Sequence, residues 1–379
     1  MQLNWKKLLS ASLVLSFALT SGCTKKNSNE IVVGHFGSMT GADATFGQST
    51  DEGIRLAIDE VNAAGGVNGK KIKLITMDTQ GKSEEAASVV TRLIEQEKVV
   101  AVLGEVASTR SLAAAPIAQA KKIPMITPSS TNPKVTEVGD YIFRVCFIDP
   151  FQGTVMAKFA VENLKAKKVA ILREVSSDYS MGLSDFFIAK FKELGGEIVA
   201  DASYQNQDKD FKAQLTQIKS KNPEAIFVPG YYTQVGLIAR QARELGIKAP
   251  LMGGDGWDSS KLFEIGGEAI NGGYFSNHYS TDSTDPAAIE FMAKFKAKYN
   301  ESPDGLSAAG YDAAQVLIAA LKSLPEINPS ALRDAIAKTT NFAGATGNIT
   351  INEQRNATKS AVVVQVQGPT NKFMTSIAP

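Results

Sequence analysis

The chain has 379 residues, with 44% hydrophobic content, 40 basic and 39 acidic side chains. This length exceeds what one hydrophobic core usually supports, so we expect two domains. The formal net charge is only +1 and no segment carries a sustained basic run. This charge balance argues against nucleic acid as a partner, because phosphate binding needs a concentrated positive face.

The N-terminal residues predict an export signal that is not part of the fold. Two lysines precede an apolar run, residues 8–19, which is too short to span a bilayer and fits the core of a secretory signal. Small residues then lead directly into Cys23, and this pattern resembles the lipobox of bacterial lipoproteins. The resemblance implies a signal peptide at 1–22, a lipid on the sulfur of Cys23 and a polar tether over 23–29. An ordinary signal peptide followed by a chance cysteine is the alternative.

The only other cysteine, Cys146, lies in a strand-like segment at 141–147. If Cys23 carries a lipid, no internal disulfide can form, and the exported fold must be stabilised by its core. We therefore predict that Cys146 is a small, buried apolar side chain.

The first part of the exported chain alternates strand-like and helix-like segments. The expected strands are 30–36, 72–77, 99–103, 124–126 and 141–147, and the expected helices are 48–64, 84–97 and 111–121. Alternation at this spacing predicts βαβ units, a parallel sheet and right-handed crossovers.

A second series of similar size follows. Its expected helices are 151–163, 182–194, 211–221 and 235–245, and its expected strands are 168–172, 197–204, 225–228 and 251–253. Two such series predict two similar α/β lobes, each doubly wound.

The pattern changes after residue 272. We expect a strand at 274–276, helices at 287–299, 307–324 and 329–338, and closing strands at 348–351 and 361–367. The last strand alternates with polar residues, which is typical of an edge strand.

Two strands of the first series end in clusters of small hydroxyl residues. Ala107, Ser108 and Thr109 follow the strand at 99–103, and residues 129–131 follow the strand at 124–126. If these strands are parallel neighbours, both clusters lie at the carboxyl edge of the sheet, where open α/β sheets bind ligands. The first cluster also opens a helix, whose free N–H groups favour a small anion such as a carboxylate. Simple helix capping is the alternative.

The strand ends of the second series carry aromatic groups and one carboxylate. Tyr179, Tyr231, Asp255 and Trp257 each follow a predicted strand, and Phe46 lies in the first series. Hydroxyls on one lobe, with aromatic rings and a carboxylate on the other, complement a small zwitterion. The alternatives are ordinary packing for Tyr231 and Trp257, and a turn at Asp255.

Several catalytic patterns are absent or incomplete. Residues 81–83 resemble the end of a phosphate-binding loop without its first glycine, and 305–309 lacks the last glycine of a nucleophile elbow, so Ser307 is better interpreted as a helix N-cap. His35 and His278 are far apart and belong to no metal-spaced cluster. We therefore expect no enzyme activity, no cofactor and no metal.

The sequence resembles the periplasmic leucine/isoleucine/valine-binding protein family, the receptors of branched-chain amino-acid ABC transporters. The matching segments are IVVG at 31–34, SMTG at 38–41, GGVNG at 65–69, ITP at 126–128, PGY at 229–231 and GGDG at 253–256. Their order and spacing carry the resemblance.

The resemblance implies a type I periplasmic binding protein fold, in which two α/β lobes are joined by a three-stranded hinge and close on a ligand. Lobe 1 would comprise residues 30–147 and 281–352, and lobe 2 residues 148–280 and 353–379. The three crossings would fall near 147–149, 279–282 and 353–357.

The resemblance also implies roles for individual residues. Ser108 would receive the ligand carboxylate through its hydroxyl and backbone N–H, and Thr131 would contact both carboxylate and ammonium. Ser129 would offer a backbone carbonyl to the ammonium. Asp255 falls where the family often has a glutamate that pairs with the ammonium.

The remaining members of the predicted site line its walls. Tyr179 and Tyr231 would close over the ligand, and Phe46 stands where some members have tyrosine. Ala107 and Trp257 complete the set. We expect Glu105 and Arg110, which flank the first cluster, to be solvated or to support the site from behind.

These observations predict a lipid-anchored binding protein that captures a branched-chain or other neutral amino acid and delivers it to the membrane subunits of an ABC permease. A ligand-sensing receptor of the same fold, or a binder of an amide or a small aromatic or aliphatic carboxylate, is the alternative. An exported α/β enzyme is disfavoured by the incomplete motifs.

Overall fold

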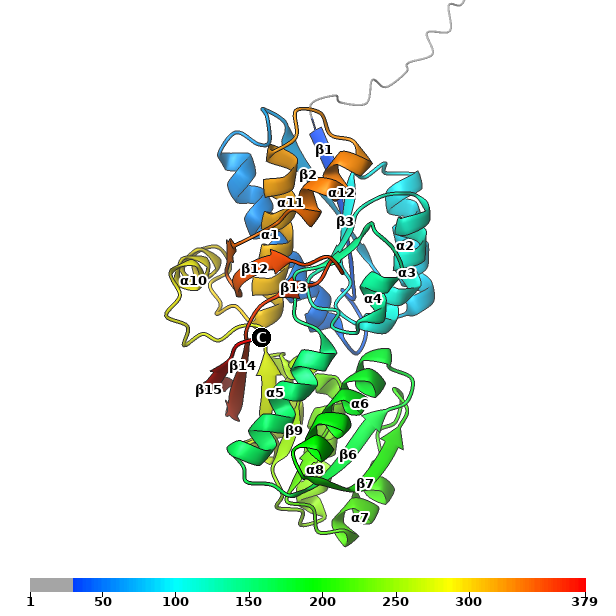
Figure 1. Ribbon diagram of the computed structural model, residues 1–379, viewed down its shortest axis with the longest axis vertical. Coiled ribbons are helices and arrows are strands. Elements are labelled where there is room, and N and C mark those ends of the chain that lie inside the picture. Colours follow the sequence, from blue (N-terminus) through cyan, green and yellow to red (C-terminus); the bar gives the residue numbers. More distant parts are fainter. Residues whose placement is uncertain (1–29) are drawn as a thin grey trace, which may run out of the picture.

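The computed structural model describes residues 30–379, which form two lobes stacked along the long axis of the molecule (Figure 1). The predicted signal peptide at 1–22 and the tether with Cys23 lie outside the described residues.

The first lobe is built on a parallel sheet with the strand order β2-β1-β3-β4-β5. The strands are β1 (Glu30–Gly37), β2 (Lys71–Asp78), β3 (Ala101–Leu103), β4 (Met125–Thr127) and β5 (Ile142–Arg144). The helices between them are α1 (Ala44–Ala63), α2 (Ser83–Glu95), α3 (Ser108–Ala120) and the short α4 (Lys134–Glu137).

This sheet is buried on both faces, which explains why β3 to β5 read as short, continuous apolar runs. On one face Val33 shares a core with Ile54 of α1 and Leu317. On the other face Val102 packs with Leu93 of α2 and Ala114 of α3.

The second lobe has a seven-stranded sheet with the order β15-β14-β10-β9-β8-β6-β7. Its parallel strands are β6 (Lys168–Glu174), β7 (Glu197–Tyr204), β8 (Ala225–Phe227), β9 (Leu251–Gly253) and β10 (Tyr274–Asn277). Strand β14 (Ala361–Gln367) pairs antiparallel with β10, and β15 (Thr370–Ile377) pairs antiparallel with β14. The helices are α5 (Asp149–Glu162), α6 (Asp178–Glu193), α7 (Lys212–Ser220), α8 (Tyr232–Glu244) and α9 (Lys261–Gly266), with short 3-10 turns at η1 (Asp255–Trp257) and η2 (Gly267–Ile270).

The chain passes between the lobes three times. It leaves lobe 1 after β5, returns after β10 through α10 (Pro286–Tyr299), α11 (Gly305–Lys322) and α12 (Pro329–Ala337), and leaves again before β14. A small antiparallel sheet of β11 (Phe342–Gly344), β12 (Gly347–Ile351) and β13 (Ala357–Thr358) precedes the last passage. Because Ala357 belongs to the core of lobe 1, this passage lies at 359–360, slightly beyond the segment expected from the sequence.

Two sequence predictions about the segments after residue 300 are wrong. The strand at 361–367 is not an edge strand, because β15 pairs along its outer side. The side chains of β15 are mostly exposed, so this strand lacks the apolar alternation that would have predicted it.

The second wrong prediction concerns the start of α11. Ser307 is not its N-cap; Asp304 caps the helix, and Ser307 is its partner in a capping box.

The long helices α1 and α11 pack closely because glycines lie between them. A Cβ atom on Gly53 of α1 would overlap the carbonyl oxygen of Ser307, and one on Gly310 of α11 would lie 2.5 Å from that of Thr50. The start of α11 is therefore held against α1, which places Leu306 at the boundary between the lobes.

We predict that Gly53→Ala destabilises the protein by roughly 1–3 kcal/mol, because the added methyl group must push α11 away and this overpacking outweighs the better helix propensity of alanine. Equilibrium urea unfolding measures the change. Ser88→Ala on the exposed face of α2 is the control and should leave the unfolding midpoint in place. Equal midpoints for Gly53→Ala and the unchanged protein would contradict the close-packing argument.

Candidate ligand-binding site

The structure brings the two hydroxyl clusters together at the carboxyl edge of the lobe 1 sheet. Strands β3 and β4 are parallel neighbours, and Ser108, Ser129 and Thr131 at their ends are all buried. Ser108 is the first residue of α3, and its Oγ accepts a hydrogen bond from the backbone N–H of Asn132 at 3.2 Å. Ala107, also buried, precedes the helix as its N-cap.

Ser130 fixes these loops from within the protein. Its Oγ donates to the carbonyl oxygens of Glu105 (2.8 Å) and Val106 (2.9 Å) and lies 2.7 Å from the Oγ of Ser111. In contrast, the hydroxyls of Ser129 and Thr131 have no hydrogen-bond partner within residues 30–379. Ser130 therefore fixes the backbone of the loop after β3, and the hydroxyls of Ser129 and Thr131 remain available to a ligand.

Of the two roles expected for Glu105 and Arg110, the structure favours support from behind the site over a solvated position, because both side chains are buried. The Glu105 carboxylate accepts hydrogen bonds from Ser38 Oγ (2.7 Å) and the Ala107 N–H (2.8 Å), and it lies 2.9 Å from Arg110 Nε. Arg110 also pairs with Asp43 at 2.8 Å. Burial opposes the charge of Arg110, but Glu105 and Asp43 raise its pKa overall, so the guanidinium stays charged. This ion pair anchors the loop that presents Ser108.

Lobe 2 contributes a stack of aromatic rings. Tyr179 and Tyr231 are nearly parallel with ring centroids 5.4 Å apart, and Phe46 of lobe 1 meets the edge of Tyr231 at 5.4 Å. The Tyr179 hydroxyl accepts a hydrogen bond from the Gly256 N–H at 3.1 Å, whereas the Tyr231 hydroxyl has no partner in the described part of the chain.

Asp255 is buried at the start of η1, and its two oxygens are held by different elements. Gln152 of α5 donates to one oxygen at 2.7 Å, and His278 Nε2 lies 3.0 Å from the other. Burial lowers the pKa of His278, which favours a neutral ring that donates to Asp255. Sequence reasoning missed both supporting residues, because neither lies near Asp255 in the chain.

Trp257 lies in the core of lobe 2 behind Asp255. It is fully buried, and its indole N–H donates to the carbonyl oxygen of Val228 at 2.9 Å. The structure therefore favours the packing interpretation of Trp257 over direct contact with a ligand.

A second carboxylate, Asp149, was also missed. It is fully buried at the start of α5, next to the first crossing, and its N–H donates to the carbonyl oxygen of Thr131 at 3.0 Å. Neither of its side-chain oxygens meets hydrogen-bond geometry with any described residue. Burial and the negative charge of Asp255 raise the pKa of Asp149 to about 8, although the nearby Thr131 hydroxyl and Arg144 act in the opposite direction. From the sequence, Asp149 was predicted only to lie at the end of the first crossing between the lobes, near residues 147–149.

The lobes contact each other directly around this site. The Asp178 N–H donates to Thr109 Oγ1 at 2.9 Å, and Asn132 Nδ2 donates to the Asp178 carbonyl oxygen at 2.8 Å. Phe46, Val106 and Leu306 of lobe 1 belong to the same apolar cluster as the tyrosines of lobe 2. The lobes are thus closed over a set of polar atoms with an apolar wall.

Cys146 is buried as predicted, and its Sγ donates to the Ser130 carbonyl oxygen at 3.4 Å. Within residues 30–379, no group of three or more histidine, cysteine or acidic side chains is arranged to hold a metal ion. The same residues include no helix that combines the length and apolar character needed to cross a membrane.

Comparison with known proteins identifies the class to which this fold and site belong. Residues 30–372 match the family model described as periplasmic binding protein, and the chain belongs to that family. Within it, the relatives place the chain in the Leu/Ile/Val-binding group.

Three relatives illustrate the match. An amino acid binding protein of Pseudomonas aeruginosa is 34% identical over 323 residues, covering 84% of this chain and 85% of the relative. The crystal structure of a leucine-binding protein from Thermotoga maritima is 44% identical with a TM-score of 0.89, covering 92% of this chain and 99% of that one. A branched-chain amino acid transporter substrate-binding protein from Streptococcus pneumoniae, solved in complex with isoleucine, is 36% identical with a TM-score of 0.88, covering 92% of this chain and 100% of that one.

We predict that Glu105→Gln costs about 3 kcal/mol of stability, because it removes one partner of a buried ion pair and leaves Arg110 under-compensated. Chemical denaturation measures this loss. The matched control is Glu95→Gln, whose carboxylate pairs with Lys121 on the surface and whose removal should leave the midpoint nearly unchanged. If both variants unfold at the same denaturant concentration, Glu105 does not anchor the loop.

Proposed function

We propose that this protein is the lipid-anchored substrate-binding component of an ABC transporter, which captures a branched-chain or other neutral amino acid between its lobes and delivers it to the permease. The observation that carries the proposal is the set of buried, unpartnered polar atoms between the lobes: the hydroxyls of Ser129, Thr131 and Tyr231 and the carboxylate of Asp149. Relatives that are named for leucine binding, or solved with isoleucine, support the ligand class.

The carboxylate of the ligand would bind at the start of α3. The helix begins at Ser108, and its backbone hydrogen bonds start with the Arg110 and Ser111 N–H groups, which donate to the carbonyl oxygen of Ala107. The N–H groups of Ser108 and Thr109 precede that pattern, and the helix dipole favours an anion there. The hydroxyls of Ser108 and Thr131 add donors on either side.

The ammonium group would bind on the opposite side, between Asp255 and Asp149. Gln152 and His278 orient Asp255, and each carboxylate oxygen can accept a further hydrogen bond. A buried ammonium requires a negative partner, and these two carboxylates supply it.

The aliphatic side chain of the ligand would lie against the apolar wall. Phe46, Val106 and Leu306 come from three separate segments of lobe 1 and pack with Tyr231 of lobe 2. An apolar wall of this kind favours a branched aliphatic side chain over a charged one, because a charge there would lack a partner.

Such a ligand touches both lobes, so its binding shifts the population toward the closed form. Residues 1–22 as a secretory signal and Cys23 as the lipid attachment site belong to this proposal and rest on the sequence alone. Together they would keep the binding protein outside the cytoplasm and beside its permease.

A thermal-shift screen of the common amino acids, with amides, benzoate and short aliphatic acids, tests this function. Leucine, isoleucine or valine at 100 times its dissociation constant should add roughly 2.7 kcal/mol of stability. A shift with benzoate and with no amino acid would support the carboxylate-binding alternative. No shift with any compound of the panel would contradict the binding function.

We predict that Asp255→Asn weakens leucine binding by about 10- to 100-fold, because it removes a hydrogen bond between charged groups that is worth about 1.5–3 kcal/mol. The same variant should bind 4-methylpentanoate, which lacks the ammonium, nearly as well as the unchanged protein does. Isothermal titration calorimetry compares the two ligands. Equal losses for both would mean that Asp255 only shapes the turn.

Leucine binding should strengthen as the pH rises from 6 to 8. Asp149, with its pKa of about 8, is largely protonated at pH 7 without ligand, and an adjacent ammonium would favour its ionised form. Binding therefore releases a proton, and affinity rises by up to tenfold per pH unit below that pKa. The groups that act on Asp149 are Thr131, Asp255 and Arg144.

Titrations at pH 7 in buffers of different ionisation enthalpy measure the proton release directly. Asp149→Asn is the control and should abolish both the proton release and the pH dependence. An affinity that is equal at pH 6 and pH 8 in the unchanged protein would contradict an ammonium partner role for Asp149.

A further inference from the structure

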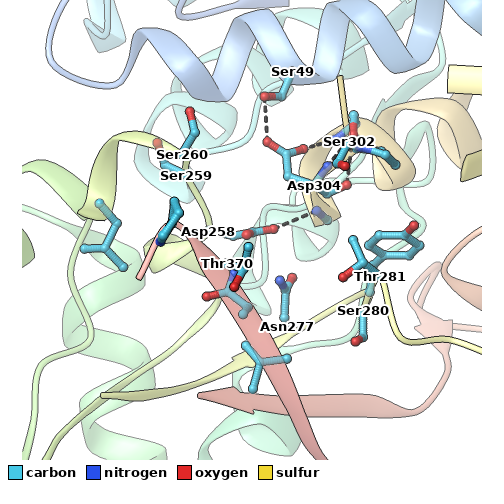
Figure 2. Close-up of a pocket in the computed structure, with 18 of the residues that line it drawn as sticks. Ser49, Asp258, Ser259, Ser260, Asn277, Ser280, Thr281, Ser302, Asp304 and Thr370 are labelled. Carbon is cyan, nitrogen blue, oxygen red and sulfur yellow. Dashed lines mark hydrogen bonds between the residues drawn. The ribbon is translucent and has the colours of Figure 1, made fainter. Parts of the chain in front are cut away.

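Apart from the candidate ligand-binding site, a cavity of about 280 Å³ lies at the junction of the lobes, on the side where β14, β15 and α11 meet (Figure 2). Lobe 1 contributes Ser49 and Glu52 of α1 and Asp304 before α11. Lobe 2 contributes Asp258, after η1, and Thr370 of β15. Its volume is just below the range of roughly 300–1,000 Å³ found for small-molecule sites, which suits a small occupant.

The charged groups of this cavity are all acidic. Its lining includes Glu52, Asp258, Glu301 and Asp304 and, among the described residues, no lysine, arginine or histidine. Burial and the negative charges of Asp304 and Glu301 raise the pKa of Glu52 to about 7, and burial with Asp304 raises that of Asp258. Lys298, outside the lining, opposes the rise in the pKa of Glu52. A cation bound among these carboxyl groups would favour their ionised forms, which repulsion and burial otherwise oppose.

The lining also contains a buried polar atom without a partner. Tyr279 is only 4% exposed, and its hydroxyl has no hydrogen-bond partner within residues 30–379. Burial and the charges of Asp304 and Asp258 raise the pKa of Tyr279, which means that its hydroxyl lies within reach of their fields. This buried hydroxyl without a partner is an observation separate from the carboxylates and indicates an occupant with polar groups.

The rest of the lining is apolar and favours an organic occupant over a bare metal ion. Leu262, Phe295 and Val366 contribute apolar walls. The acidic groups are not arranged as a metal site within the described chain. An amino acid is also a poor fit, because its carboxylate would face four acidic side chains.

We propose that this cavity binds a small organic ammonium ion, such as an alkylamine or a diamine without a carboxylate, and that its binding holds the lobes closed. The link to closure follows from the lining, since Asp258 of lobe 2 already accepts a hydrogen bond from the Gly305 N–H of lobe 1 at 2.6 Å. Asp304 beside it accepts from Ser49 Oγ at 2.7 Å (Figure 2). A cation between these carboxylates bridges both lobes.

The effect on amino-acid capture rests on the proposed function. Coupling between two binding sites is reciprocal. If the ammonium ion favours the closed form and so tightens leucine binding by some factor, leucine must tighten binding of the ammonium ion by the same factor.

Isothermal titration of 1,4-diaminobutane into the purified protein, alone and saturated with leucine, tests the proposal, with n-butanol as the uncharged control compound. We expect the diamine to bind, butanol not to bind, and saturation with leucine to tighten diamine binding about fivefold or more. Glu52→Gln should weaken diamine binding at least fivefold. Glu162→Gln, an exposed acidic residue of α5, should leave it unchanged.

Absence of diamine binding, or equal binding by the two variants, would overturn the proposal. So would binding of calcium chloride at the Glu52-dependent site when the diamine does not bind. An affinity that leucine leaves unchanged would overturn the link to closure. Diamine binding without leucine binding would instead uphold the cavity and contradict the proposed amino-acid function.

Discussion

Polar groups that lie between the two lobes must find partners when the lobes close, and this requirement shapes the whole molecule. The hydroxyls of Ser129, Thr131 and Tyr231 and the carboxylate of Asp149 are buried without protein partners in the described chain. Each such group costs about 1–3 kcal/mol when it is left unsatisfied. A zwitterion that reaches both lobes removes these costs together. Closure is thereby coupled to the ligand, even though part of the interface, such as the contact between Thr109 and Asp178, forms between protein groups alone.

This coupling depends on neighbouring residues with different roles, because some hold the backbone in place and others leave polar atoms available to a ligand. The Ser130 hydroxyl donates to the carbonyl oxygens of Glu105 and Val106, whereas the hydroxyls of Ser129 and Thr131 have no hydrogen-bond partner in the described chain. Glu105 in turn is locked by Arg110 and by backbone and hydroxyl donors. The edge of the sheet is therefore rigid where it must present Ser108, and polar groups are left open only where a ligand can reach them.

Sequence patterns predicted most of the helices and strands of both lobes, because buried parallel strands and amphipathic helices leave clear periodicities. The convergence of the two hydroxyl clusters also followed from the order of β3 and β4. Other features depend on tertiary contacts between distant segments. No local sequence signal indicates that Glu105 is buried with Arg110, or that Gln152 and His278 hold Asp255. The same is true of Leu306 of α11, which packs at the boundary between the lobes. The exposed strand β15 was missed because its outward side chains carry no apolar alternation.

The most direct test of the account is a high-resolution crystal structure of the protein soaked with leucine. The ligand carboxylate should lie within hydrogen-bond distance of Ser108 and Thr131 at the start of α3, and the ammonium should lie between Asp149 and Asp255. Its aliphatic side chain should lie against Phe46 and Leu306. A leucine bound elsewhere, or one whose carboxylate is turned away from the start of α3, would contradict the claim that these buried polar groups form the ligand site.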